Sequence, residues 1–128
     1  MDRAFLVLAG VFGFTGVAAG AFGAHALAGR IPPERLVTFD TAVRYQLWHV
    51  FAIFAVVVLR TIGPDAASET VAGWAFVLGV VLFSGSLYAL ALSGVRRWGA
   101  VTPFGGLAFL VGWAAFVVAA ATATFRFG

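Results

Sequence analysis

Four long apolar stretches, separated by short charged segments, decide what this chain can fold into. They run over residues 4–29, 45–59, 70–95 and 98–125. Three of them exceed the roughly 20 residues that an α-helix needs to cross about 30 Å of hydrocarbon. The second stretch can span only by including the turn before it, which brings Arg44 just inside the boundary, from where a long side chain reaches the headgroups. The pattern predicts an all-α membrane protein, a bundle of four transmembrane helices.

The composition excludes the other fold classes. Of 128 residues, 62% are hydrophobic and 10% charged, the mean hydropathy is +1.04, and 16 glycines come on top. Soluble domains are about a quarter charged, and disordered chains need low hydrophobicity. With no cysteine, disulfides, thiolate metal sites and cysteine nucleophiles are also excluded. We therefore expect a single transmembrane domain over residues 1–128, with spans at about 4–28, 41–61, 70–94 and 102–125.

The connections contain ordinary helix breakers. Residues 29–33 (GRIPP) end the first span, and 63–65 (GPD) form a turn. Residues 34–44 mix charged and apolar side chains, which predicts a short interfacial helix before the second span. A signal peptide cleaved near His25 is the alternative for the first stretch. Its apolar run is too long for that, and Asp2 offsets Arg3.

All the positive charge is arginine, and its placement predicts the topology. The net charge of +3 comes without any lysine, and the arginines are scattered rather than gathered on one face, so the expected partner is the lipid bilayer and not nucleic acid. An even number of spans puts both termini on one side. The positive-inside rule then predicts both termini outside the cytoplasm. The termini side holds Arg3, Arg60 and Arg126, and the other side Arg30, Arg35, Arg44, Arg96 and Arg97.

Small residues repeat at helical spacing along the spans. Lipid gives helices no hydrophobic reason to associate, so close approach through small residues becomes important. Glycine lowers helix propensity, and a stripe of it needs a packing reason. Packing inside the bundle and a homo-oligomer interface both remain open. The packing glycines predicted in this way are Gly13, Gly16, Gly20, Gly23, Gly79, Gly105 and Gly112.

Polar residues gather around the start of the second span. Asp40 and Arg44 are four residues apart, as are Tyr45 and His49, so each pair shares a helical face. Ionisable groups at membrane depth are functional candidates, although an ion pair near the boundary also serves as an anchor. The candidate polar cluster consists of His25, Asp40, Arg44, Tyr45, Gln46, His49, Ser84, Ser86 and Tyr88.

His49 is the deepest ionisable residue of the cluster. It can bond a neighbouring helix, take part in a proton relay or ligate a cofactor. Haem ligation would need a second histidine at matched depth, and zinc would need more ligands than the chain offers. No Ser-His-Asp arrangement, phosphate loop or pair of carboxylates at catalytic spacing is present. We therefore predict no catalytic residue, no metal site and no cofactor.

Four segments in order carry a family resemblance: GAFGAHAL at 20–27, TAVRYQ at 41–46 with His49, FSGSLY at 83–88, and TPFGG at 102–106 with Gly112 and Trp113. The chain resembles the family known as domain of unknown function 423, which includes the small transmembrane protein 256. The resemblance implies a four-helix protein of the bacterial inner or plasma membrane, and it implies no activity. The family's motif positions correspond to Gly23, His25, Tyr45, His49, Ser84, Gly85, Ser86, Tyr88, Thr102, Pro103 and Gly106.

Three functions fit these observations. The first is a non-enzymatic structural or accessory subunit, acting in a homo-oligomer or a larger membrane complex. The second is a small oligomeric transporter or channel for an ion or polar solute, lined by the polar cluster. The third is a quinone- or haem-binding membrane protein in which His25 and His49 bind or relay protons.

Overall fold

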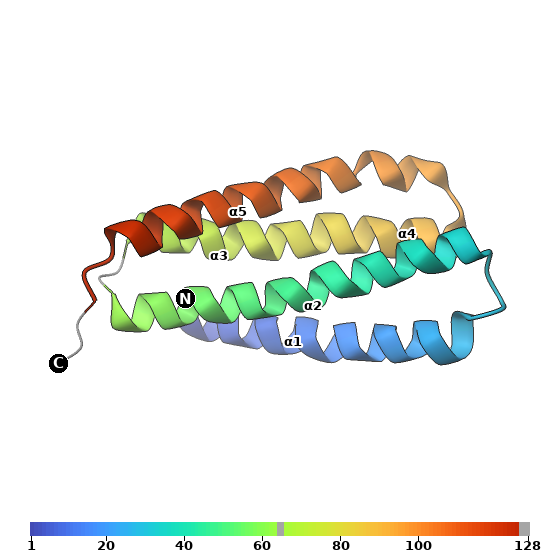
Figure 1. Cartoon of the computed structure of the whole chain (residues 1–128), viewed down its shortest axis with the longest axis horizontal. Helices are drawn as coiled ribbons and strands as arrows, with labels where there is room; N and C mark the ends of the chain where they lie inside the picture. The colour runs from blue at the N-terminus through green and yellow to red at the C-terminus, as the bar shows by residue number, and fades with distance from the viewer. Residues whose placement is uncertain (64–65, 126–128) are drawn as a thin grey trace.

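The computed structural model describes residues 1–63 and 66–125. Pro64 and Asp65 of the predicted turn, and Arg126 of the topology count, lie outside the described residues. The helices form four antiparallel rods (Figure 1). In chain order the elements are α1 (Asp2–Phe22), the π-helical turn η1 (Gly23–Leu27), α2 (Pro33–Ile62), α3 (Ala67–Gly79), the π-helical turn η2 (Val80–Ser84), α4 (Gly85–Ser93), the 3₁₀ turn η3 (Arg96–Ala100) and α5 (Thr102–Thr122).

The predicted fold class is confirmed. Each rod is long and apolar enough to cross a membrane, and the described residues contain no strand. The third rod joins α3, η2 and α4 without a break, and the fourth joins η3 and α5.

The interfacial helix predicted for residues 34–44 is wrong as a separate element. α2 runs unbroken from Pro33 to Ile62. The reason is local: after Pro33 in the first turn, no proline or glycine occurs until Gly63, so nothing interrupts the hydrogen-bond ladder at the membrane boundary. The charged segment is the first part of the second span itself.

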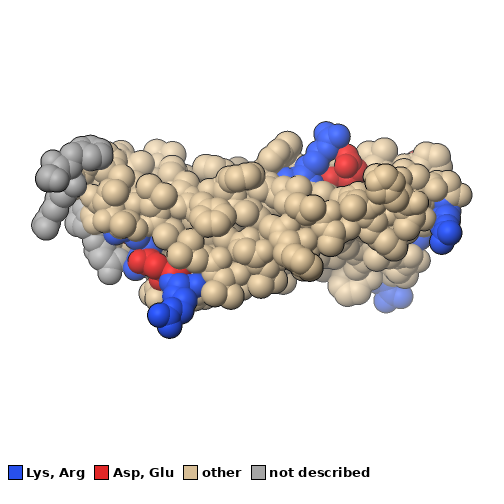
Figure 2. Space-filling model, turned by 90° about the horizontal axis from the view of Figure 1, so that it is seen from below, with Lys and Arg blue, Asp and Glu red and all other residues tan. Residues whose placement is uncertain are grey.

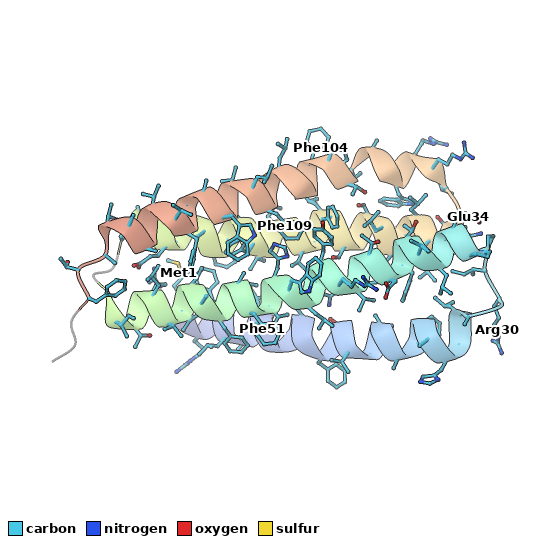
Figure 3. All side chains as sticks on the ribbon, viewed as in Figure 1. Met1, Arg30, Glu34, Phe51, Phe104 and Phe109 are labelled. Atoms are coloured by element: carbon cyan, nitrogen blue, oxygen red, sulfur yellow. The ribbon has the colours of Figure 1, made fainter. Side chains whose placement is uncertain are left out.

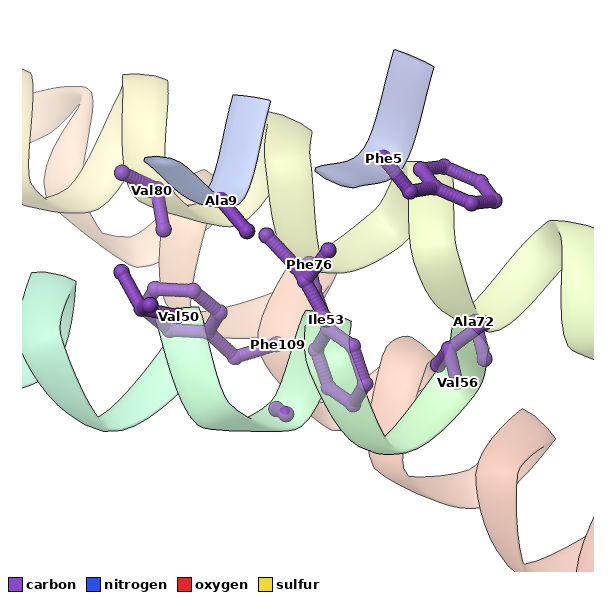
Figure 4. Close-up of a cluster of buried hydrophobic side chains, with 10 residues drawn as sticks. Phe5, Ala9, Val50, Ile53, Val56, Ala72, Phe76, Val80 and Phe109 are labelled. Carbon is purple, nitrogen blue, oxygen red and sulfur yellow. The ribbon is translucent and has the colours of Figure 1, made fainter. Parts of the chain in front are cut away.

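The core lies between α2 and the third rod. α2 packs against α1 on one side and against α3, η2 and α4 on the other, while α5 packs mainly on α3 and η2. The main apolar cluster draws side chains from every rod, and Figure 4 shows them meeting between the helices. Its buried members are Phe5, Ala9, Val50, Ala52, Ile53, Val56, Ala72, Phe76, Val80 and Phe109.

The outer surface of the bundle is apolar. Phe14 is 78% exposed, and Figure 3 shows Phe104 pointing away from the bundle while Phe109 lies between the helices. Charged side chains occupy few places on the face seen in Figure 2, most of them toward the ends of the molecule. Such a surface is unfavourable in water and suited to lipid.

Both termini belong to one end of the bundle. α1 begins, α2 ends, α3 begins and α5 ends toward that end (Figure 1). There Arg60, whose side chain is 8% exposed, forms an ion pair with Asp2 and donates to Thr70 Oγ1 at 2.9 Å. The start of α1, the end of α2 and the start of α3 are thereby joined.

Candidate functional site

Gln46 is the centre of a buried polar network. Its side chain is in an apolar stretch of α2, and the residue is 4% exposed. The amide Nε2 donates to the backbone oxygen of Phe12 and to Thr15 Oγ1, both at 2.8 Å, and Oε1 accepts from the Tyr88 hydroxyl at 2.7 Å. Both amide hydrogens are therefore used, and Gln46 joins α1, α2 and α4.

His49 lies one turn further along α2 and is also 4% exposed. Its Nδ1 is 2.7 Å from the Tyr45 backbone oxygen, and the indole nitrogen of Trp113 donates to its Nε2 at 3.2 Å. A carbonyl only accepts and an indole N–H only donates. Nδ1 must then carry the proton and Nε2 must be unprotonated, which fixes a neutral imidazole in a single tautomer.

Aromatic rings surround this imidazole. The Phe109 ring stacks on it with centroids 3.6 Å apart and planes 11° apart. Phe76 lies 5.6 Å from it and Tyr45 6.2 Å, measured between ring centroids. Because both nitrogens are bonded to protein and the Phe109 ring stacks on the imidazole, the geometry favours a role for His49 in helix packing.

Two serines of the third rod form a second set of interhelical bonds. Ser84 is 1% exposed, and its hydroxyl donates to the Ala42 backbone oxygen at 2.7 Å. Ser84 ends the π-helical turn η2, so the local widening of the helix accompanies this contact. Ser86 lies 2.6 Å from Thr102 Oγ1, measured between the hydroxyl oxygens, and joins α4 to α5.

Of the other predicted members, His25 and the Asp40–Arg44 pair lie apart from this network, whereas Tyr45 borders it. His25 is exposed in η1, whose buried residues are Gly23 and Leu27. Asp40 and Arg44 form an ion pair at 2.8 Å on the outer surface, with side chains 56% and 65% exposed. Tyr45 contributes its backbone oxygen to His49 and packs its ring on Phe83, with centroids 4.5 Å apart. The structure thus brings together Gln46, His49 and Tyr88 with their partners, and leaves the charged pair outside.

The predicted packing glycines face neighbouring helices. A Cβ added to Gly105 would lie 2.3 Å from the backbone nitrogen of Phe83, and one added to Gly79 would lie 2.3 Å from the Phe109 ring. In α1, Gly16 faces Leu47 and Gly23 faces Phe39, at 2.7 and 3.0 Å from an added Cβ. Gly13, Gly20 and Gly112 would meet Val50, Val43 and Phe76 at 3.8, 3.4 and 2.6 Å.

Several functional contacts have no clear signal in the sequence. Trp113 and Thr15 complete the network, yet an indole or a hydroxyl in an apolar stretch also suits lipid, and the family segment that includes Trp113 does not indicate its partner. Arg35 donates from Nε to the Ala91 backbone oxygen at 2.8 Å, and from its guanidinium to the Leu92 oxygen at 3.0 Å, which satisfies the end of α4. In the sequence, Arg35 is one more arginine of the charged segment before the second span, and nothing there indicates that it contacts α4.

A buried carboxylate at the termini end was also missed. Glu69 is 1% exposed, and its Oε2 accepts from the Ala66 backbone N–H at 3.3 Å, while Oε1 has no hydrogen-bond partner among the described residues. It lies in the first turn of α3, where the helix dipole favours a negative charge.

Hollows in the surface lie away from the buried network. One groove of about 300 Å³ runs between the end of the first rod and the start of α2. The groove is lined by Gly20, Gly23, Ala24, Leu36, Val37, Phe39, Asp40 and Val43.

In residues 1–63 and 66–125, no group of three or more His, Cys, Asp or Glu side chains could hold a metal ion.

Known proteins resemble this chain over nearly its whole length. The family described as "Protein of unknown function (DUF423)" matches residues 19–106. UPF0382 membrane protein YwdK of Bacillus subtilis is 42% identical, covering 92% of this chain and 96% of that protein. UPF0382 inner membrane protein YgdD of Escherichia coli K12 is 41% identical, covering 93% and 90%. No solved structure matches the chain significantly.

Proposed function

The chain belongs to the DUF423 family of membrane proteins, and from that premise we propose that it is a non-enzymatic structural subunit of the bacterial inner or plasma membrane. Its role would be to present a rigid helical surface to other membrane proteins. The observation that carries this proposal is that the buried polar side chains bond to neighbouring helices. Gln46, His49 and Ser84 each form a hydrogen bond with a residue of another rod.

Rigidity follows from where these bonds go. Gln46 connects the first, second and third rods, and His49 adds the fourth through Trp113. In lipid an interhelical hydrogen bond contributes about 0.6 kcal/mol on average and about 1.7 at most. Several such bonds, together with glycines in near contact with opposing side chains, favour one fixed arrangement of helices over a moving one.

Transport or cofactor binding would use the same residues differently. A pathway needs polar side chains that face water, and a quinone or haem site needs a free donor or ligand. Gln46 and His49 are 4% exposed and hydrogen-bonded to protein, which supports the structural role over both alternatives.

The test is purification of the full chain from its native membrane in a mild detergent. We expect a discrete assembly larger than the 13.4 kDa chain, with a constant partner or a fixed number of copies. A monodisperse monomer without any co-purifying protein would contradict the proposal. Solute flux into liposomes that is abolished by His49→Ala, with the fold intact, would instead support transport.

The orientation is part of the same proposal. Both termini belong to one end of the bundle, and the opposite end holds Arg30, Arg96 and Arg97. The positive-inside rule assigns that arginine-rich end to the cytoplasm. The termini then lie on the outer side of the membrane.

A further inference from the structure

α2 exposes one continuous stripe of side chains to the outside of the bundle. The stripe consists of Val37, Asp40, Arg44, Trp48 and Phe51, at successive spacings of three, four, four and three residues. Val37 is 67% exposed, Trp48 56% and Phe51 71%. Such a spacing is that of a seam along which two helices pack. We call these five residues the α2 stripe.

The charged pair of the stripe lies at membrane depth. Arg35 and Arg60, toward the two ends of α2, are about 37 Å apart along the helix at 1.5 Å per residue. A hydrocarbon core of about 30 Å centred between them places Asp40 about 4 Å inside it, and Arg44 about 10 Å inside. Charged groups at such depth normally face the interior of a bundle. This pair faces outward, with side chains 56% and 65% exposed.

We infer that a second copy of this chain covers the α2 stripe, related to the first by a two-fold axis along the membrane normal. A two-fold contact joins the same patch of both copies. Near the axis it places Asp40 of each copy beside Arg44 of the other, so that two isolated ion pairs become one ring of four alternating charges. Because both copies carry the same Asp40–Arg44 pair, each offers the other an acid and a base at the required depth. A different protein would need its own acid and base in matching positions.

A groove lies beside the pair. The groove of about 300 Å³ opens next to Val37 and Asp40, and the rest of its lining is apolar. Lipid headgroups reach this pair only through the long side chain of Arg44, whereas a second copy brings its own charges to the depth of the pair. A protein surface with its own charges at that depth is the better match.

The first test exchanges charges between copies. Asp40→Arg and Arg44→Asp, each alone, give a stripe with a single sign, and we expect both to lose the dimer in mild detergent and in lipid nanodiscs. Co-expression of the two variants under different tags should restore a mixed dimer, because each supplies the charge that the other lacks. Unchanged dimers in either single variant, or no mixed pair on co-expression, would overturn the inference.

The second test needs no charge change. The sequence has no cysteine, so between two copies of this chain a single added cysteine can cross-link only to its counterpart, and the product is identified by its dimer mass. We expect Val37→Cys and Trp48→Cys to form disulfide dimers on oxidation in native membranes, because stripe residues meet across the axis. Phe14→Cys on α1 and Val117→Cys on α5, 78% and 63% exposed, are the matched controls and should stay monomeric.

Cross-linking that is absent at the stripe, or equal at all four positions, would overturn the two-fold arrangement. The inference does not depend on the proposed structural function. A monomer bound to a constant foreign partner would remove the dimer and leave that function standing, whereas a lipid-bound monomer without any protein partner would remove both.

Discussion

A primary amide in the middle of a membrane span is costly unless all of its hydrogen-bonding groups are used. Gln46 meets this condition with three short bonds to two neighbouring helices, α1 and α4. His49 meets it with one donor and one acceptor, each of which fits only one tautomer. At the scale of single residues, the buried polar side chains therefore fix the relative positions of the helices.

Replacing Gln46 with leucine should destabilise the folded bundle by about 2–5 kcal/mol, since three interhelical bonds are lost at about 0.6 to 1.7 kcal/mol each. Tyr88→Phe removes a single bond and should cost about 1 kcal/mol. Unfolding by SDS in mixed micelles, followed by circular dichroism, measures both. Thr61→Val, which removes an exposed bond within α2, is the control. Equal stability of Gln46→Leu and the control would contradict the network's role.

The tautomer of His49 is a second prediction. In ¹⁵N NMR spectra of the detergent-solubilised chain, His49 should show a protonated Nδ1 and an unprotonated Nε2. Trp113→Phe should shift the Nε2 resonance because its donor is lost. Exposed His25 provides the internal reference. A protonated Nε2 on His49 would be inconsistent with the donor from Trp113.

Sequence reasoning reached Gln46, His49 and Tyr88 because polar residues stand out in apolar stretches. Their partners did not stand out. The acceptors are largely backbone oxygens, which carry no sequence signal, and Trp113 resembles any aromatic residue of a membrane helix. His25 was grouped with them because it is close to the same membrane side, yet the glycine face of the first rod turns toward α2 and leaves His25 outside.

Close contact between helices depends on glycine at the scale of elements. Gly105 of α5 faces the backbone of η2, and Gly73 of α3 faces the Phe5 ring, with 2.3 Å between an added Cβ and the nearest atom in both. The glycine periodicity pointed to Gly105 and missed Gly73. Neither π-helical turn was predicted, because such a turn has no residue signature, and the continuity of α2 shows that charge alone does not end a helix.

Gly105→Ala and its neighbour Gly106→Ala form a matched pair. The first places a methyl group 2.3 Å from the Phe83 nitrogen, and since backbone cannot move aside cheaply, we expect a loss of about 1–3 kcal/mol. The second meets nothing within 4 Å and should be neutral or stabilising by up to about 1 kcal/mol through helix propensity. The same SDS unfolding assay applies. Equal effects would show that α5 does not pack on η2 as described.

The whole molecule is an elongated apolar helical bundle. Most of its charged side chains lie toward the two ends, and the Asp40–Arg44 ion pair lies on its side. Four apolar stretches were enough to predict this architecture. In lipid the backbone N–H and C=O groups must bond to each other, and an α-helix satisfies them within a single stretch of chain. Which rods touch was beyond the sequence, since the first, third and fourth spans all carry small residues at helical spacing and any of these faces could meet any other.

Orientation is testable with two alanine-to-cysteine variants in the cysteine-free chain. Ala67→Cys lies at the termini end, and Ala28→Cys at the opposite end. A membrane-impermeant maleimide should label Ala67→Cys in intact spheroplasts and Ala28→Cys only after lysis. The reverse pattern would place the termini in the cytoplasm.

The ion pair between Asp2 and Arg60 links residues 58 positions apart. During synthesis the first rod therefore leaves the ribosome well before its anchor exists. Until α2 has been translated to its end, the Asp2 carboxylate lacks its Arg60 partner, so this bond cannot hold the start of the first rod. The contact closes only when the second rod is complete, which makes the helical hairpin, rather than the single helix, the unit that it fixes.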